Sequence, residues 1–275
     1  MPTAPAAPWA AATGADPFGP WADLDVRGVM QRFRWAPPGR FLMGSPDGEA
    51  GRYPHEGPPH EVTLSHGCWM ADTPVTQALY RAVMGKNPSH CTRPPAPRRP
   101  VEQVSWEDAV RFTRRLTALR PSGAPDDGLV FQLPSEAQWE HACRAGAATP
   151  TYAPAGKGLD DVAWTHANAM GSTQPVGQLL PNAWGLFDTL GNVWEWCADA
   201  RLRWDAPYPS GPRTDPFGDA GPSRALRGGS WFVDPLLARA AARHAIEPAL
   251  RYGVVGLRLS RGRPHPPLQP DDLEA

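Results

Sequence analysis

Few side chains in this sequence stand at spacings that support catalysis or metal binding. The four cysteines are widely separated and form no CxxC pair, so neither a zinc knuckle nor a dithiol redox motif is predicted. A cysteine nucleophile needs a base within reach, and the sequence identifies none for Cys143 or Cys197, which we interpret as small buried hydrophobic residues. His55 and His60 lie close together in HEGPPHE, but the glycine and prolines between them exclude a helix with both rings on one face. His60 is therefore expected to be an ordinary polar residue before a strand.

The composition limits the classes of protein to which this chain can belong. Of its 275 residues, 35 are proline and 27 are glycine, which disfavours a helix bundle, while 12 tryptophans and a hydrophobic share of 41% exclude disorder for most of the chain. The formal net charge of -1 gives no electrostatic case for binding nucleic acid or an anionic membrane. The first residues do not read as a signal peptide, and no apolar run reaches the roughly 18 residues of a membrane span. We therefore expect a cytoplasmic protein with free thiols.

The patterned segments predict an α+β fold with short strands, two or three helices and much irregular backbone. Helices are expected at 76–85, 105–119 and 135–146, each beginning at a Ser or Thr that can cap the helix N-terminus. Strands are expected at 40–45, 60–65, 130–134, 224–231 and 254–260, and after residue 147 helical periodicity is limited to 236–243. We predict one domain over 21–261, between a poorly ordered Pro/Ala-rich arm (1–20) and a Pro-rich acidic tail (262–275).

Several segments of the chain form an ordered set of motifs. They are GRFLMGS (39–45), PHEVTL (59–64), DTPVTQALY (72–80), NPSH (87–90), RPVEQVSWEDAVRF (99–112), LPSEAQWEHACRAG (133–146), PNAWGLFDTLGNVWEWCAD (181–199), RALRGGSW (224–231) and GLRLSR (256–261). In this order and spacing they resemble the formylglycine-generating-enzyme/sulfatase-modifying-factor family, over about residues 35–261. The resemblance implies a C-type-lectin-like core with additional helices and loops.

The chain departs from this family at the positions that carry its chemistry. The family resembles copper-dependent oxidases, with two cysteines at the third and eighth positions after the GGS motif. Those positions are Val233 and Ala238 here, and no cysteine follows Cys197. Because valine and alanine neither ligate copper nor cycle between redox states, we expect no copper and no formylglycine-generating activity. The histidine cluster of the family's iron-dependent branch is not recognisable either, so we expect no iron.

The resemblance also implies a structural calcium site in the loop around GNVWEW. The matching residues are Asp188, Gly191, Val193 and Glu195, of which the two acids supply charge and the other two supply carbonyl oxygens. In the alternative interpretation, Glu195 caps local backbone N–H groups. The tryptophans of this segment are expected to pack in the core.

The stretch 227–258 keeps the arginines of the family pattern but has an unusually apolar set of residues between them. We predict that this set binds a ligand; its members are Phe232, Val233, Leu236, Leu237, His244, Ile246, Leu250, Tyr252 and Val254. The same pattern resembles the C-terminal variable region of proteins diversified by retroelements, which vary one exposed face of a lectin-like scaffold. In the alternative interpretation, some of these residues belong to the core.

These observations favour a non-catalytic protein that presents a recognition surface at about residues 232–255 to a protein or peptide ligand, with no nucleic acid or membrane partner. Two alternatives remain. The chain is an oxidase of the formylglycine-generating type that acts on a protein or peptide cysteine, or it is an inactive regulatory homologue within a larger assembly. Fold similarity does not decide between them, because function resides in the site.

Overall fold

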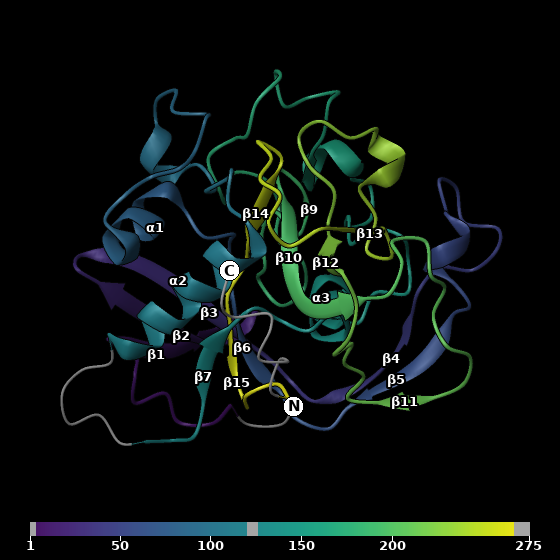
Figure 1. Ribbon diagram of the computed structural model, residues 1–275, viewed down its shortest axis with the longest axis horizontal. Coiled ribbons are helices and arrows are strands. Elements are labelled where there is room, and N and C mark those ends of the chain that lie inside the picture. The colour runs from purple at the N-terminus through teal and green to yellow at the C-terminus, as the bar shows by residue number, and fades with distance from the viewer. Residues whose placement is uncertain (1–3, 120–125, 267–275) are drawn as a thin grey trace.

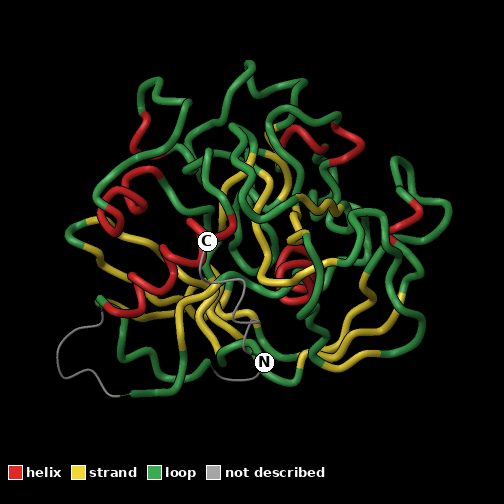
Figure 2. Tube along the Cα trace, in the orientation of Figure 1, coloured by secondary structure: helices red, strands yellow, loops and turns green. Residues whose placement is uncertain are grey.

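The protein is described here by a computed structural model covering residues 4–119 and 126–266 (Figure 1). Within these ranges the chain forms three α-helices, α1 (Gln77–Met84), α2 (Trp106–Ala118) and α3 (Glu136–Arg144), together with short strands in four sheets. Much of the remaining backbone is loop, especially in the upper part of the view in Figure 2. The arrangement confirms the predicted α+β class. Among the described residues, no helix has the length and apolar character needed to cross a membrane.

All three helices begin at their predicted caps. The side chains of Thr76, Ser105 and Ser135 each accept the backbone N–H of the third helical residue, which satisfies a donor that the helix itself leaves unpaired. The third helix ends one residue earlier than expected. Ala145, and not Gly146, is its C-terminal cap, with a left-handed φ of 45°.

The strands form one large sheet and three smaller ones. The six-stranded sheet has the order β1 (Ala12–Asp16), β2 (Gly19–Val26), β3 (Val29–Ala36), β6 (Cys68–Ala71), β15 (Ser260–Gly262), β7 (Val130–Gln132). The four-stranded sheet has the order β13 (Arg243–Ile246), β12 (Ser223–Arg227), β10 (Trp194–Arg201), β14 (Val255–Leu257). The three-stranded sheet has the order β11 (Arg213–Thr214), β5 (His60–Leu64), β4 (Gly39–Met43). The two-stranded sheet pairs β8 (Ala163–Trp164) with β9 (Leu190–Gly191). Single 3₁₀ turns are η1 (Pro54–Glu56), η2 (Ala96–Arg98), η3 (Leu159–Asp161) and η4 (Pro235–Leu237).

The predicted strands are present, most of them shorter than expected, and two of them differ strongly in extent. The strand expected over 224–231 stops at Arg227, because Gly228 and Gly229 both take positive φ values (98° and 78°) that extended backbone does not allow. The segment expected as one strand over 254–260 is divided between β14 and β15, which belong to different sheets. The helix suggested by the periodicity over 236–243 does not form, and only the short turn η4 lies there.

The main core lies between the six-stranded sheet and helices α1 and α2. It contains Phe33 and Trp69 from the sheet and the stacked rings of Tyr80 and Phe112, whose centroids are 5.2 Å apart, from the two helices. Trp196 of β10 is fully buried in the same core, so the four-stranded sheet packs against the same interior. The prediction that Trp196 packs in the core is therefore confirmed.

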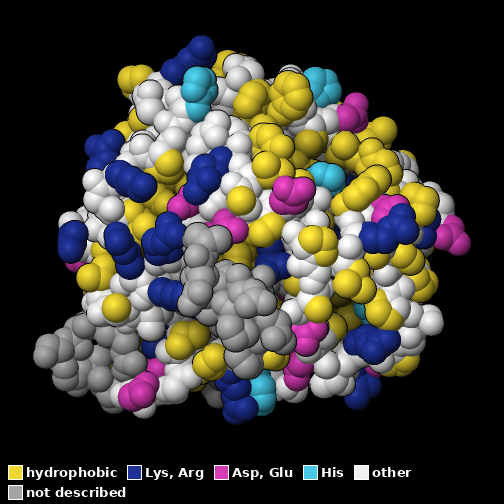
Figure 3. All heavy atoms as spheres, viewed as in Figure 1, with side chains coloured by type: hydrophobic (Ala, Val, Ile, Leu, Met, Phe, Trp, Pro, Cys, Tyr) yellow, Lys and Arg dark blue, Asp and Glu magenta, His cyan; other side chains and the backbone are white. Residues whose placement is uncertain are grey.

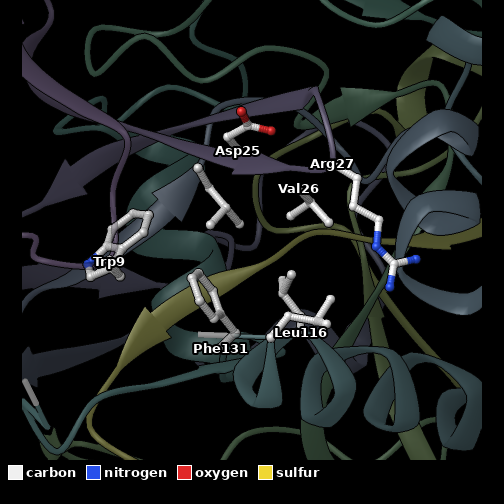
Figure 4. A pocket seen from close by; sticks show the side chains of 8 residues that line it. Trp9, Asp25, Val26, Arg27, Leu116 and Phe131 are labelled. Atoms are coloured by element: carbon white, nitrogen blue, oxygen red, sulfur yellow. The ribbon is translucent and has the colours of Figure 1, made fainter. Parts of the chain in front are cut away.

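The expectation of a poorly ordered N-terminal arm is wrong for residues 4–20. Trp9 is only 4% exposed, and its ring lies edge-on to Phe33 and Phe131 at centroid distances of 5.2 and 5.4 Å. In Figure 4, Trp9, Phe131, Val26 and Leu116 surround a cavity of about 140 Å³. A single large aromatic side chain buries enough apolar surface to fix a segment that otherwise looks like a linker.

The C-terminal strand β15 lies inside the six-stranded sheet, between β6 and β7. Ser260 is paired with Met70 on one side and with Gln132 on the other. The described chain continues only to residue 266, so most of the predicted acidic tail lies outside the described residues. Strand β15 is thus an interior strand of its sheet, although it comes after the other five strands in the sequence.

Candidate functional site

Four buried arginines hold the segments around β12, β13 and β14 in place, and we call them the arginine frame. Each is at most 6% exposed and pairs with buried carboxylates: Arg227 with Glu140, Arg239 with Glu49 and Glu56, Arg243 with Glu136, and Arg258 with Glu195. Breaking one such pair leaves an uncompensated charge in the interior, which is strongly unfavourable. The frame therefore fixes the backbone from which the intervening side chains project.

Strand β13 shows how the frame divides inward from outward residues. Arg243 and Ala245 are buried, whereas His244 and Ile246 are only half-buried, as the two-residue period of a strand requires. The strand is paired on one side with β12 in antiparallel register, Arg227 opposite Arg243. Two of the predicted ligand-binding residues, His244 and Ile246, therefore lie on its outer side.

The nine predicted ligand-binding residues form what we call the recognition face. None of the nine is fully buried, and three are well exposed: Phe232 at 70%, Leu236 at 55% and Tyr252 at 45%. The other six are half-buried. In Figure 3, hydrophobic side chains gather at the upper right, over the region of β13 and the loops beside it. The three well-exposed side chains therefore face outward, whereas Ile246 and Val254 also pack against the main core, as the alternative interpretation expected for some of the set.

Backbone hydrogen bonds tie the second half of the recognition face to the body of the protein. The Trp231 indole donates to the Gly253 carbonyl (2.9 Å), and the amide of Gln103 donates to the Tyr252 carbonyl (3.0 Å). The Trp194 amide donates to the Val254 carbonyl at 2.8 Å. The loop is thus anchored through its main-chain carbonyls, and the side chains of Tyr252 and Val254 take no part in these contacts.

An aromatic cluster borders the recognition face and was not predicted from the sequence. The rings of Tyr53 and His55 stack at 5.5 Å, and Trp204 lies edge-on to both His55 (5.7 Å) and His244 (6.2 Å). Trp194 contacts the other side of His244 at 6.2 Å. Trp204 is 54% exposed and Tyr53 is 47% exposed, so the cluster enlarges the apolar face. The four parts of the sequence involved are distant from one another or separated by a loop, and no local pattern predicts that they meet.

Both histidines of this cluster favour the neutral form. Burial lowers the pKa of the His244 ring, and the neighbouring His55 and Arg201 lower it further. Burial likewise lowers the pKa of His55. Desolvation disfavours the charged imidazolium, so the cluster is uncharged at neutral pH. An uncharged aromatic border suits apolar or aromatic ligand groups.

The two positions where relatives are expected to carry cysteines lie together beside Gly229. A Cβ on Gly229 would stand 3.2 Å from Val233 Cγ2 and 3.5 Å from the Cα of Ala238. Their side chains offer no metal ligand and no thiol. The buried thiols elsewhere do not replace them, because burial raises the pKa of Cys143 to about 11 and keeps it protonated.

The two carboxylates predicted to bind calcium, Asp188 and Glu195, make other interactions in this structure. Both carboxylate oxygens of Glu195 accept hydrogen bonds from Arg258, and one also accepts the Trp139 indole N–H at 2.6 Å. Asp188 accepts the Gly177 amide at 2.7 Å, and burial raises its pKa to about 6. Across 4–119 and 126–266, no group of three or more His, Cys, Asp or Glu side chains is placed to hold a metal. Glu195 is an ion-pair partner here, a role neither sequence interpretation anticipated.

Taken together, the mixed short sheets, the long loops and the buried arginines define a C-type-lectin-like fold. The family comparison agrees: residues 26–263 match the sulfatase-modifying factor enzyme 1-like domain, and the chain belongs to this family. It is 35% identical over 181 residues to the formylglycine-generating enzyme of Streptomyces coelicolor, a match that covers 59% of this chain and 52% of that protein. The chain thus spans about half the length of the curated relatives it matches.

Two solved structures resemble the chain over nearly their whole length. Treponema denticola variable protein 1 superposes with a TM-score of 0.76 at 29% identity, covering 89% of this chain and 99% of that one. PvdO from Pseudomonas aeruginosa superposes with a TM-score of 0.68 at 28% identity, covering 91% of this chain and 97% of that one. The resemblance to the family inferred from the motifs is confirmed.

Proposed function

We propose that this protein is a non-catalytic binding protein whose recognition face takes a protein or peptide ligand. The proposal rests on the contrast between buried and surface residues within 227–258. The arginine frame is buried and paired, whereas all nine recognition-face residues reach the surface. Exposed apolar side chains that gather in one place mark binding sites more often than not. The chain also lacks the two thiols of the family's chemistry, because Val233 and Ala238 stand at their positions.

The ligand that fits this face presents apolar and aromatic side chains. Phe232, Leu236, Tyr252 and Trp204 are exposed, and the histidines beside Trp204 are held neutral. Burial of aromatic residues supplies most of the binding energy in protein interfaces, which makes Phe232 and Trp204 the expected anchors.

The likeness to a structure named a variable protein supports diversification of this face. The neighbour shares 29% identity and nearly its full length with this chain. Residues that vary must point outward from a fixed backbone, and the recognition face meets this requirement. The test is genomic: a nearby reverse-transcriptase gene and a near-copy of the DNA for 227–258, differing only opposite template adenines. A locus without either contradicts diversification but leaves ligand binding intact.

Selection of peptides from a random phage-displayed library tests the binding function. A variant with Phe232→Ser, Leu236→Ser and Tyr252→Ser removes the three exposed side chains of the face. Selected peptides should bind it at least about tenfold more weakly, a loss of about 1.4 kcal/mol. The control is Met30→Ser on β3, a residue 53% exposed outside the recognition face, which should bind like the unaltered chain. Equal binding by the triple variant, or a library without binders, would overturn the proposal.

The enzymatic alternative has a direct assay. The chain is incubated with a CxPxR-type peptide and copper, and the peptide is examined by mass spectrometry. We expect the cysteine to remain unchanged, because Val233 and Ala238 provide neither a thiolate for copper nor a redox partner. Conversion of that cysteine to formylglycine would establish the alternative instead.

A further inference from the structure

A cavity of about 480 Å³ lies beneath the loop that follows β10. Its lining includes Arg201, Arg243, Glu136 and Asp199, together with residues of β11 and of the loop 206–209. All four of these charged residues are at most 6% exposed. The volume falls within the range of small-molecule sites in proteins. The cavity is separate from the residues of the recognition face, none of which lines it.

The buried charges at the floor of this cavity are not balanced. Glu136 is the carboxylate that Arg243, Arg227 and Arg201 share: Arg243 Nε donates to Oε1 at 2.7 Å, Arg227 Nε lies 3.5 Å away, and Arg201 Nη1 lies 3.8 Å away. Although burial alone raises the pKa of Glu136, the three guanidinium groups lower it to about 2. Glu136 is therefore fully ionised and still faces three cations.

The other nearby carboxylates reduce this excess only in part. Glu140 pairs with both Arg227 and Arg144, so it adds as many cations to the cluster as it neutralises. Burial raises the pKa of Asp199 to about 7, which leaves this carboxyl only partly charged at neutral pH. Its two oxygens accept the backbone amides of Glu136 (2.7 Å) and Gly218 (3.0 Å). The net charge around the cavity floor is positive.

Arg201 is the least satisfied member of this cluster. Its Nη2 donates to the Ala206 carbonyl, but Nη1 is buried and has no hydrogen-bond partner in the described part of the chain. Glu136, at 3.8 Å, is too far to accept a hydrogen bond from it. A buried donor without an acceptor costs about 1–3 kcal/mol, and more when it is charged. Arg201 also lines the cavity, where an acceptor of negative charge would relieve it.

The walls above this floor are largely apolar. They include Met43, Ala137, Leu202 and Phe217. Two exposed lining residues, Arg213 and Asp219, carry opposite charges and together add no net charge. A ligand that fits such a site has an apolar body and one anionic end.

From this arrangement we infer that the cavity binds a small organic carboxylate, whose carboxylate lies beside the guanidinium group of Arg201 and whose apolar body lies against Met43 and Phe217. Hydrogen bonds between charged partners are among the strongest in proteins, and low exposure strengthens them. The loop that covers this site also carries Trp204 to the aromatic cluster. The inference is independent of the recognition face.

Calorimetric titration with a matched pair of probes tests the inference. Benzoate carries the carboxylate, and benzamide has the same shape without the charge. Benzoate should bind at least about tenfold more tightly than benzamide, and Arg201→Gln should remove that preference. The control Arg213→Gln alters an exposed arginine at the mouth and should keep the preference. The triple variant of the recognition face should also bind benzoate normally, which separates this inference from the proposed function.

Two further measurements test the inference if the Arg201→Gln variant does not fold. Arg201→Lys keeps the charge and should retain part of the preference for benzoate. In the unaltered chain, benzoate should shift the amide resonances of Arg201, Ala206 and Gly218, which surround the floor. Equal binding of benzoate and benzamide, loss of binding on Arg213→Gln alone, or amide shifts confined to other regions would each overturn the inference.

Discussion

Arg258 and Glu195 form an ion pair in which each side chain is only 1% exposed, with Nη2 of the arginine 2.8 Å from Oε1 of the carboxylate. Arg258 Nε reaches the same carboxylate at 2.9 and 3.1 Å. The pair joins the strand β14 region to β10, and it occupies the oxygens that a calcium ion would need. The ion pair therefore bears both on the stability of the fold and on the predicted calcium site.

Removing one member of this pair should strongly destabilise the protein. Arg258→Met leaves the Glu195 carboxylate buried with the Trp139 indole as its remaining side-chain donor, so we expect a loss of about 3–5 kcal/mol in the free energy of unfolding. Urea denaturation measures it. The control is Arg203→Met, whose pair with Asp205 is solvent-exposed and should leave the urea midpoint almost unchanged. Similar losses in both variants would show that burial of the pair is unimportant.

Chelation of calcium should leave the thermal stability unchanged. The Glu195 oxygens are already bound by Arg258, so a bound ion would have to displace a buried guanidinium group. A ligand that binds only the folded state raises stability by mass action. Melting temperatures are compared with EDTA and with added calcium. A rise with calcium that EDTA reverses would mean that this carboxylate exchanges partners.

Substitutions on the recognition face should be tolerated far better than substitutions in the arginine frame. Leu236→Asn alters a side chain that is 55% exposed and should change the free energy of unfolding by no more than about 0.5 kcal/mol. Arg227→Met removes a fully buried cation from Glu140 and should cost about 3–5 kcal/mol. Chemical denaturation of the two variants side by side is decisive. A large loss in the free energy of unfolding of Leu236→Asn would indicate that this side chain is part of the core.

The N-terminal tryptophan should matter for stability despite its place in a Pro/Ala-rich segment. Trp9→Ala empties a site between Phe33 and Phe131 and should cost about 3–5 kcal/mol. Trp204→Ala serves as the control, because that ring is 54% exposed and its removal creates no cavity of comparable size. If thermal unfolding shows no difference between the two variants, residues 4–20 do not belong to the cooperative core.

His244 should make the protein less stable as the pH falls. In the unfolded chain its ring takes up a proton near pH 6.5, whereas burial keeps the pKa of the folded ring lower, so acidification favours the unfolded state between these two values. His244→Phe removes this proton uptake. The variant should therefore gain stability relative to the unaltered chain between pH 7 and pH 5, measured by urea denaturation at each pH. A constant difference would indicate an unshifted ring.

Local signals in the sequence were enough to predict the helices. Ser105 and Ser135 act as N-caps because a hydroxyl and the amide three residues later interact within one turn, independently of the rest of the chain. Strands β1 to β3 were missed because a Pro- and Gly-rich composition hides their pairing, which depends on the burial of Trp9 and Phe33 in a distant core. Helix ends are local properties, whereas sheet membership is not.

The same distinction applies to the candidate site. The sequence singled out Phe232 and Leu236 by their place between motif arginines, but their exposure is known only from the structure. The partners of His244, which are Trp204 and Trp194, meet it only through the tertiary fold. The unpartnered Arg201 Nη1 also has no sequence signature, since its state depends on how three arginines divide one carboxylate.

The interior position of β15 has a consequence for biosynthesis. The ribosome makes this strand well after β6 and β7, yet both of these strands hydrogen-bond to it, one on each side. Until it emerges, the six-stranded sheet is split into two pieces with open edges, and Arg258 is absent from Glu195. Unpaired strand edges in incomplete chains promote aggregation. The six-stranded sheet is therefore completed only after β15 has been translated, and a message truncated before residue 258 yields a chain prone to aggregate.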